Sequence, residues 1–220
     1  ISGFCIHLPF RNGEKLVLSR YYARRYLRIL APLAGAIAVY YLVGIQVDLL
    51  GDNSILWRSV LWSLVCEEIY YAIYPLLRML RMRFGWKAFL GGCFSLAIAV
   101  LATHPYSDDW RGYGPVRTAL ILLPIWLMGC LLAEKAAALK PFDSARTIWL
   151  WRLGIWFASW TCEILHFKAH AYYTVTMLPF GILAFFWIQQ EIRYGMVGTK
   201  PWRPLVSAGA WSYSLYLIHG

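Results

Sequence analysis

Two adjacent carboxylates, Glu67 and Glu68, lie near the middle of the apolar stretch WRSVLWSLVCEEIYYAIYP, residues 57–75. The stretch is long enough to cross a membrane, where an ionisable group costs about 3 kcal/mol on insertion scales. Such groups face a protein interior or a watery cavity, and they mark a functional site by default. The alternative is a carboxylate that pairs with an arginine or with tyrosines for packing alone, which explains two adjacent acids less well.

Hydroxyl groups accompany Glu67 on one face of the predicted helix. At 3.6 residues per turn, one polar stripe contains Ser63, Glu67, Tyr70, Tyr71 and Tyr74. Glu68 is turned about 100° away, toward a neighbouring helix or an end of the cavity. The stripe therefore predicts a carboxylate with hydrogen-bond donors beside it.

A second group of residues that could do chemistry lies in the basic segment YYARRYLRILAP, residues 21–32. Arg25 and Arg28 are spaced i, i+3 with Arg24 beside them, so two guanidinium groups share one face and could bind phosphate oxygens. Basic residues at the cytoplasmic end of a membrane helix are also expected from topology and lipid electrostatics alone. Both interpretations stay open on this evidence.

Histidines occur in two further places. In WSYSLYLIH, residues 211–219, a stripe at i, i+4, i+7 contains Ser212, Tyr216 and His219, although a lone histidine in an apolar helix is more often a core residue. In the loop HFKAHA, His166 and His170 have a metal-compatible spacing but no third ligand nearby. We therefore expect a solvated loop there and no metal site.

The elements that must position these residues are transmembrane helices. Hydrophobic residues make up 60% of the 220 and charged residues only 15%, which is typical of an integral membrane protein. We expect an all-α polytopic bundle with six complete spans, at 27–47, 55–77, 86–103, 118–139, 147–165 and 172–190. A partial segment precedes them at the N-terminus, and a truncated seventh begins near residue 205. Because the chain opens on Ile1 and stops inside an apolar segment, we treat it as part of a longer protein.

Loop charges predict the orientation. If Pro9–Arg28 is cytoplasmic, 17 of the 21 Lys and Arg residues fall on the cytoplasmic side, as membrane topology requires. The same distribution argues against a nucleic-acid partner despite the net charge of +10, because the basic residues lie in short connections and form no stripe. The five cysteines include no CxxC pair, and we expect them to be small buried hydrophobes.

Five motifs in a fixed order carry a resemblance: ISGF, ARRYLRILAP, LWSLVCEEIYYAIYP, LPIWLMGCLLA and SYSLYLIH. Together they resemble the acyltransferase 3 family, membrane proteins that O-acylate bacterial surface carbohydrates. The resemblance covers essentially the whole chain. Besides the groups above, its motif residues are Ser2, Gly3, Phe4, Trp62, Ser63, Tyr213 and Ser214.

The resemblance implies a single integral-membrane acyltransferase domain over residues 1–220, incomplete at both ends, from a parent of about ten transmembrane helices in a bacterial inner membrane. Its donor would be cytoplasmic acyl-CoA, commonly acetyl-CoA, with no bound cofactor, and its acceptor a carbohydrate or lipid-linked glycan. The donor-associated RxxR motif would fall on Arg25 and Arg28, with Arg24 beside them. The catalytic residues would be Glu67, Tyr70, Tyr216 and His219.

One departure from the family pattern concerns the general base. The resemblance implies a catalytic histidine in a first transmembrane helix, which would lie before Ile1. His7 is no substitute, because it follows the SGF motif at the cytoplasmic end of a different helix. We therefore expect the isolated chain to be inactive and the parent protein to be active.

Two other functional classes fit parts of the sequence. A transporter or flippase could use Glu67 and Glu68 as a proton- or cation-coupled site, although the internal pseudo-repeat of many transporters is missing. A non-catalytic membrane scaffold leaves the two acids unexplained. Acyl-CoA-dependent labelling of glycan, set against flux driven by a proton gradient, separates the first two classes.

Overall fold

The computed structural model describes residues 1–42, 62–103, 105, 113–142, 144–198, 203–204 and 206–207. Within these residues every regular element is helical and no strand occurs, which confirms the predicted all-α class. The chain divides into two compact units. One comprises Ile1–Glu14 and Leu80–Thr199, and the other comprises Lys15–Met79 and Lys200–Gly220.

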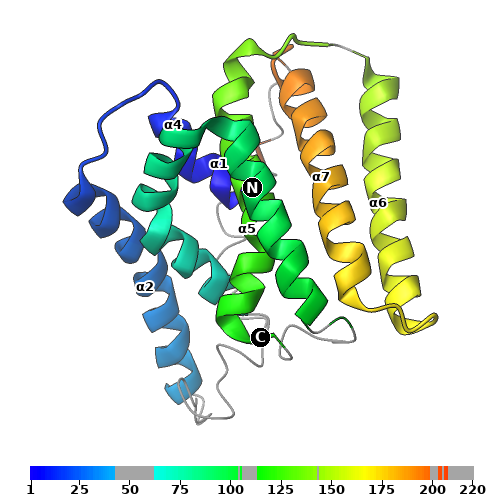
Figure 1. The fold of residues 1–220 in the computed structure, drawn as a ribbon. Helices are drawn as coiled ribbons and strands as arrows, with labels where there is room; N and C mark the ends of the chain where they lie inside the picture. Colours follow the sequence, from blue (N-terminus) through cyan, green and yellow to red (C-terminus); the bar gives the residue numbers. More distant parts are fainter. Residues whose placement is uncertain are drawn as a thin grey trace. The chain divides into compact units, whose positions relative to one another are not determined.

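The first unit is a helix bundle (Figure 1). Its elements are α1 (Ser2–His7), η1 (Leu8–Phe10), the later part of α4 (Trp62–Thr103), α5 (Gly114–Lys135), η3 (Ala136–Ala138), α6 (Ala145–Phe167) and α7 (Tyr173–Gly195). α7 packs between α5 and α6, and the short α1 packs on α5. Half of the residues of α5 are buried, whereas Ile148 is the one buried residue of α6. α5 is therefore the core of this unit.

Three helical stretches among the described residues are long and apolar enough to cross a membrane: Ser63–Thr103, Gly114–Ala138 and Val175–Gly195. α2 (Leu18–Leu42) and α6 lie where spans were predicted at 27–47 and 147–165, and their crossing of the membrane stays a prediction. The predicted spans 55–77 and 86–103 are joined as α4. The expected connection is reduced to a break at Gly85, whose φ of 71° suits a glycine.

α1 crosses α5 at two glycines that let the backbones approach closely. A Cβ on Gly3 would overlap the carbonyl oxygen of Trp126, and one on Gly129 would lie 3.0 Å from the backbone nitrogen of Phe4. The Cys130 thiol donates to the carbonyl of Gly3 at 3.3 Å, across the same crossing. The SGF motif is thus a helix-packing element in this structure.

α6 and α7 are tied by charge as well as by packing. Arg152 donates two hydrogen bonds, of 2.7 and 2.8 Å, to the carboxylate of Glu191, which also accepts from the Trp187 indole at 3.0 Å. Ser144 caps the start of α6 by accepting from the backbone N–H of Thr147. The remaining surface of α6 exposes large aromatic and aliphatic side chains, as a lipid-facing helix does.

The second unit contains α2 and the beginning of α4. Pro75 lies inside α4 and has no N–H, so the carbonyl of Tyr71, four residues earlier, loses its usual intrahelical donor. The hydroxyl of Tyr21 on α2 donates to that carbonyl at 2.9 Å, and Tyr22 donates to the next one, Ala72, at 2.8 Å. Tyr21 also stacks on Tyr74, with ring centroids 5.5 Å apart. These contacts fix α2 against α4.

All five cysteines are free, and three of them, Cys66, Cys93 and Cys130, are buried as predicted. Cys5 is exposed and Cys162 is half-buried, so the prediction of buried hydrophobes is wrong for Cys5. Several predicted positions lie outside the described residues: the end of the 27–47 segment and, in the last segment, Ser212, Tyr213, Ser214, Tyr216 and His219.

We expect Gly3→Ala to prevent correct assembly of α1 on α5, because the added methyl would overlap backbone that cannot move aside. Gly92→Ala on α4 and Gly154→Ala on α6 are matched controls, since nothing lies within 4 Å of either position. The thermal unfolding midpoint in detergent should fall for Gly3→Ala and stay level or rise slightly for the controls. Equal midpoints for all three variants would contradict the close crossing.

A second prediction concerns Tyr21 and Pro75. Tyr21→Phe removes the hydroxyl that donates to the buried Tyr71 carbonyl and should cost about 1–3 kcal/mol of stability. In a Pro75→Ala background the restored N–H of residue 75 can serve that carbonyl, so Tyr21→Phe should cost clearly less. A double-mutant cycle on the free energy of unfolding measures the difference, and a cost that is the same in both backgrounds would refute the proline explanation.

Candidate active site

Glu67 is held by its own helix through a tyrosine one turn later. The Tyr71 hydroxyl donates to Oε2 of Glu67 at 2.8 Å, and the Tyr71 side chain is buried, at 7% exposure. The predicted stripe therefore forms, with Tyr71 as the residue that donates to Glu67. Tyr70, predicted to act beside Glu67, is buried on the same helix.

Arg25 reaches the same tyrosine from α2. Its guanidinium carbon lies 5.7 Å from the centroid of the Tyr71 ring, within the range of a cation–π contact. A guanidinium has five N–H donors in a planar fork, which suits it to binding an anion as well as to contacting a ring. We call these three residues the Arg25–Tyr71–Glu67 cluster. It joins one of the predicted donor-binding arginines to the predicted catalytic acid.

The other predicted residues of this region are described less completely. Arg24 is exposed on α2, and Ser63 is half-buried on α4. Arg28 follows Arg25 by three helical positions, which places both on one face of α2. The side chains of Arg28 and Trp62 lie outside the described residues.

Glu68 differs from Glu67 in its surroundings. It is half-buried, and its Oε1 atom is buried with no hydrogen-bond partner in the part of the chain that the structure describes. An unsatisfied buried acceptor costs free energy until a donor meets it. Glu68 is therefore an acid that a proton or a ligand hydroxyl can satisfy, on a different face of α4 from Glu67.

A second charged cluster lies in the first unit and was missed by the sequence analysis. The carboxylate of Glu134, near the end of α5, accepts from His7 at 2.9 Å, from the Trp86 indole at 2.7 Å and from Arg81. The Arg81 guanidinium also lies 5.3 Å from the centroid of the Trp86 ring. We call His7, Arg81, Trp86 and Glu134 the Glu134 cluster. It ties the end of α1 and the break in α4 to the end of α5.

The signal that could have indicated this cluster is weak. Glu134 is the single acid of the apolar run LPIWLMGCLLAEK, but its partners are 127, 53 and 48 residues away in sequence. His7 is almost fully buried, at 3% exposure, and serves as a partner of Glu134. Its position supports the expectation that His7 is not a general base that meets substrate.

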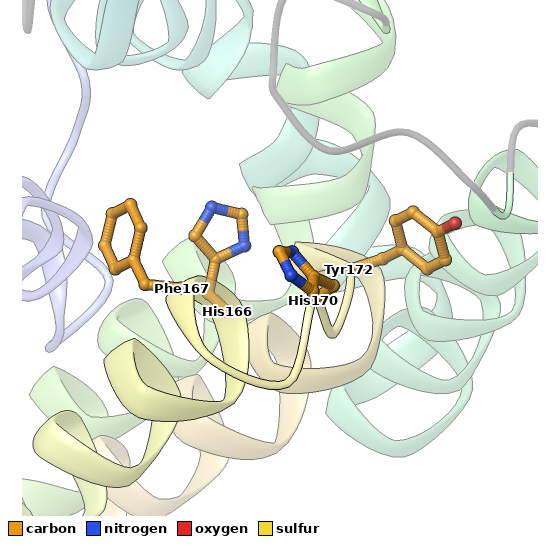
Figure 2. Close-up of a pocket in the computed structure, with 4 residues that line it drawn as sticks. All are labelled: His166, Phe167, His170 and Tyr172. Carbon is orange, nitrogen blue, oxygen red and sulfur yellow. The ribbon is translucent and has the colours of Figure 1, made fainter.

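The histidine pair of the α6–α7 connection lines a cavity of about 330 Å³, together with Phe167 and Tyr172 (Figure 2). His166 Nδ1 lies 3.2 Å from the carbonyl oxygen of Ala171, so its ring is fixed to the connection itself. Among the described residues no group of three or more histidine, cysteine or acidic side chains could hold a metal ion. The pair thus has no third ligand within the described chain.

Comparison with known proteins gives one match. A family model described as an acyltransferase domain matches residues 1–220, the whole chain. No curated protein and no solved structure matches it. The match agrees with the family that the five ordered motifs resemble, and membrane-bound catalysis agrees with three helices apolar enough to cross a bilayer. This protein therefore belongs to the acyltransferase 3 family, whose members are membrane-bound acyltransferases.

Proposed function

We propose that this protein transfers an acyl group from cytoplasmic acyl-CoA to a hydroxyl of a cell-surface or exported carbohydrate, and that the acyl group is acetyl. The acceptor could be a free or a lipid-linked glycan, and the enzyme would act in the inner membrane of a bacterium. Family membership supports the reaction class. We propose the donor, the acceptor and the acetyl group in addition to that reaction class.

The observation that carries the proposal is the Arg25–Tyr71–Glu67 cluster. An anion-binding side chain and an acid share one buried tyrosine, which contacts Arg25 through its ring and Glu67 through its hydroxyl. Acyl-CoA carries phosphates that a planar guanidinium binds well, and acyl transfer needs a polar group beside the reacting carbonyl. One cluster therefore contains the side chains for donor binding and for chemistry.

The proposed reaction is attack of a sugar hydroxyl on the thioester carbonyl. A carbon–oxygen bond forms, the carbon–sulfur bond breaks, a general base takes the hydroxyl proton, and CoA leaves as a thiolate that is then protonated. Glu67, oriented by Tyr71, would position or polarise the reacting groups. The general base would be the first-helix histidine that the family resemblance implies, with Tyr216 and His219 as further members of the site.

The loop charges support a cytoplasmic donor. They favour a cytoplasmic location for the stretch Pro9–Arg28, and Arg24, Arg25 and Arg28 would then meet acyl-CoA where it is made. Arginines at this level would also attract anionic lipid headgroups. Donor binding would depend on Arg25 itself, whereas attraction of lipid headgroups would not.

We expect the variants of the cluster to separate donor binding from chemistry in full-length protein, assayed by transfer of labelled acetyl from acetyl-CoA to glycan. Arg25→Ala should raise the KM for acetyl-CoA by about 10- to 100-fold, because a charge-assisted contact to phosphate is lost. Tyr71→Phe keeps the ring under Arg25 and should lower kcat by about tenfold with the donor KM unchanged. Glu67→Gln should lower kcat by about 100-fold.

Matched controls are available on the same chain. Arg20→Ala removes an exposed arginine of α2, and Glu163→Gln changes an exposed acid of α6. Both should leave the kinetic constants within about twofold, since surface charges of this kind contribute little. Unchanged glycan acylation by Glu67→Gln at normal protein levels would remove Glu67 from the mechanism, and an effect of Arg20→Ala equal to that of Arg25→Ala would favour lipid attraction over donor binding.

A further inference from the structure

The α6–α7 connection lies at the far end of its helix pair from the basic residues. α6 starts after Lys140, whose carbonyl accepts from Arg193 of α7 at 2.9 Å, and it ends at Phe167, from which the chain returns through residues 168–172 (Figure 1). The opposite end of the pair carries Arg146, Arg152 and Arg193, whereas the connection itself carries Lys168 alone. The charge rule therefore places the connection on the non-cytoplasmic side, where the proposed acceptor would be met.

The connection is built as a fixed turn. Ala169 and Ala171 donate backbone hydrogen bonds to the carbonyls of Ile164 and Leu165, at 3.3 and 2.8 Å, and His166 is held on the carbonyl of Ala171. His170 has a φ of 52°, a left-handed conformation that only a few per cent of non-glycine residues adopt. A turn fixed by these contacts presents its side chains in one arrangement.

That arrangement is a row of rings around one cavity. Figure 2 shows Phe167 and His166 standing side by side at the end of α6, with His170 and Tyr172 of the connection beyond them. The Phe167 and His166 ring centroids are 4.8 Å apart, and Phe167 is 64% exposed at the rim. The cavity, about 330 Å³, is at the lower end of the range of about 300–1,000 Å³ for small-molecule sites.

These side chains have the chemistry of a sugar-binding subsite. The C–H face of a pyranose ring packs on an exposed aromatic ring, while its hydroxyls need donors and acceptors, which imidazole and phenol both supply. Aromatic side chains at a membrane boundary also serve as interfacial anchors, but that role does not call for imidazoles around a cavity. A cavity with one exposed apolar ring and three amphipathic ones fits a single sugar residue better than it fits a lipid tail.

We infer that the α6–α7 connection forms an acceptor subsite, in which Phe167 stacks against one sugar residue of the glycan while His170 hydrogen-bonds its hydroxyls. The inference rests on the proposed function for the presence of a glycan acceptor. It adds a place on the chain where that acceptor is recognised.

The test uses full-length protein in lipid nanodiscs and saturation-transfer NMR with methyl glycosides of glucose, galactose, mannose, rhamnose and N-acetylglucosamine. We expect saturation transfer to at least one glycoside, reduced at least about fivefold by Phe167→Ala and by His170→Gly. Glycine adopts the φ of residue 170 freely, so the turn is kept while the imidazole is lost. Phe157→Ala is the matched control, since Phe157 is 59% exposed on the same helix and does not line the cavity.

No transfer to any glycoside, or an equal reduction by Phe157→Ala, would overturn the subsite. Acetyl-CoA-dependent glycan labelling in the same preparations distinguishes its failure from that of the proposed function. If wild type labels glycan but the acceptor KM is unchanged in Phe167→Ala and His170→Gly, the subsite alone is overturned. Glycoside binding that depends on Phe167, without any labelling by wild type, upholds the subsite and overturns the proposed acyl transfer.

Discussion

The hydroxyl of Tyr21 on the carbonyl of Tyr71 is the contact on which the candidate active site depends. Pro75 removes one backbone hydrogen bond from α4, and a donor from α2 replaces it. A backbone carbonyl buried in an apolar environment must find a partner, so this replacement sets the register of α2 along α4. Arg25 lies one helical turn after Tyr21, and this register brings it over the Tyr71 ring.

Three parts of Tyr71 then have different roles. Its backbone joins the helices, its ring contacts a cation, and its hydroxyl holds an acid that would otherwise be costly inside a membrane protein. Glu68, one residue from Glu67, has a buried oxygen without a partner among the described residues and so shows what Glu67 gains from Tyr71. The polar stripe of α4 thus stabilises the packing of α2 against α4 and also contains candidate catalytic residues.

In the first unit, Ile1–Glu14 and Leu80–Thr199, the helices are held together by close approach of their backbones and by charged contacts. Glycines let α1 lie directly on α5, and Glu134 accepts from three donors at the end of that crossing. Breaking a partly buried carboxylate cluster of this kind costs more than forming it contributes, so such clusters favour a single arrangement of the helices. Gly3 of the SGF motif and His7 both belong to this packing, which explains why α1 has a glycine where it crosses α5 and ends on a buried imidazole.

The sequence by itself determined the helical class, most of the helix positions and the polar stripe, because long apolar runs and 3.6-residue periodicity identify membrane helices. Its five ordered motifs indicated the family through their resemblance to it. It also marked Glu67 and Arg25, since charge within apolar sequence is conspicuous. Only the tertiary structure decided which tyrosine meets Glu67, that Arg25 shares it, that Gly85 replaces a loop, and that His7, Arg81 and Trp86 converge on Glu134. Apart from the Tyr71–Glu67 hydrogen bond and the break at Gly85, these are contacts between residues tens of positions apart, and the spacing along one helix carries no information about which neighbouring helix packs against it.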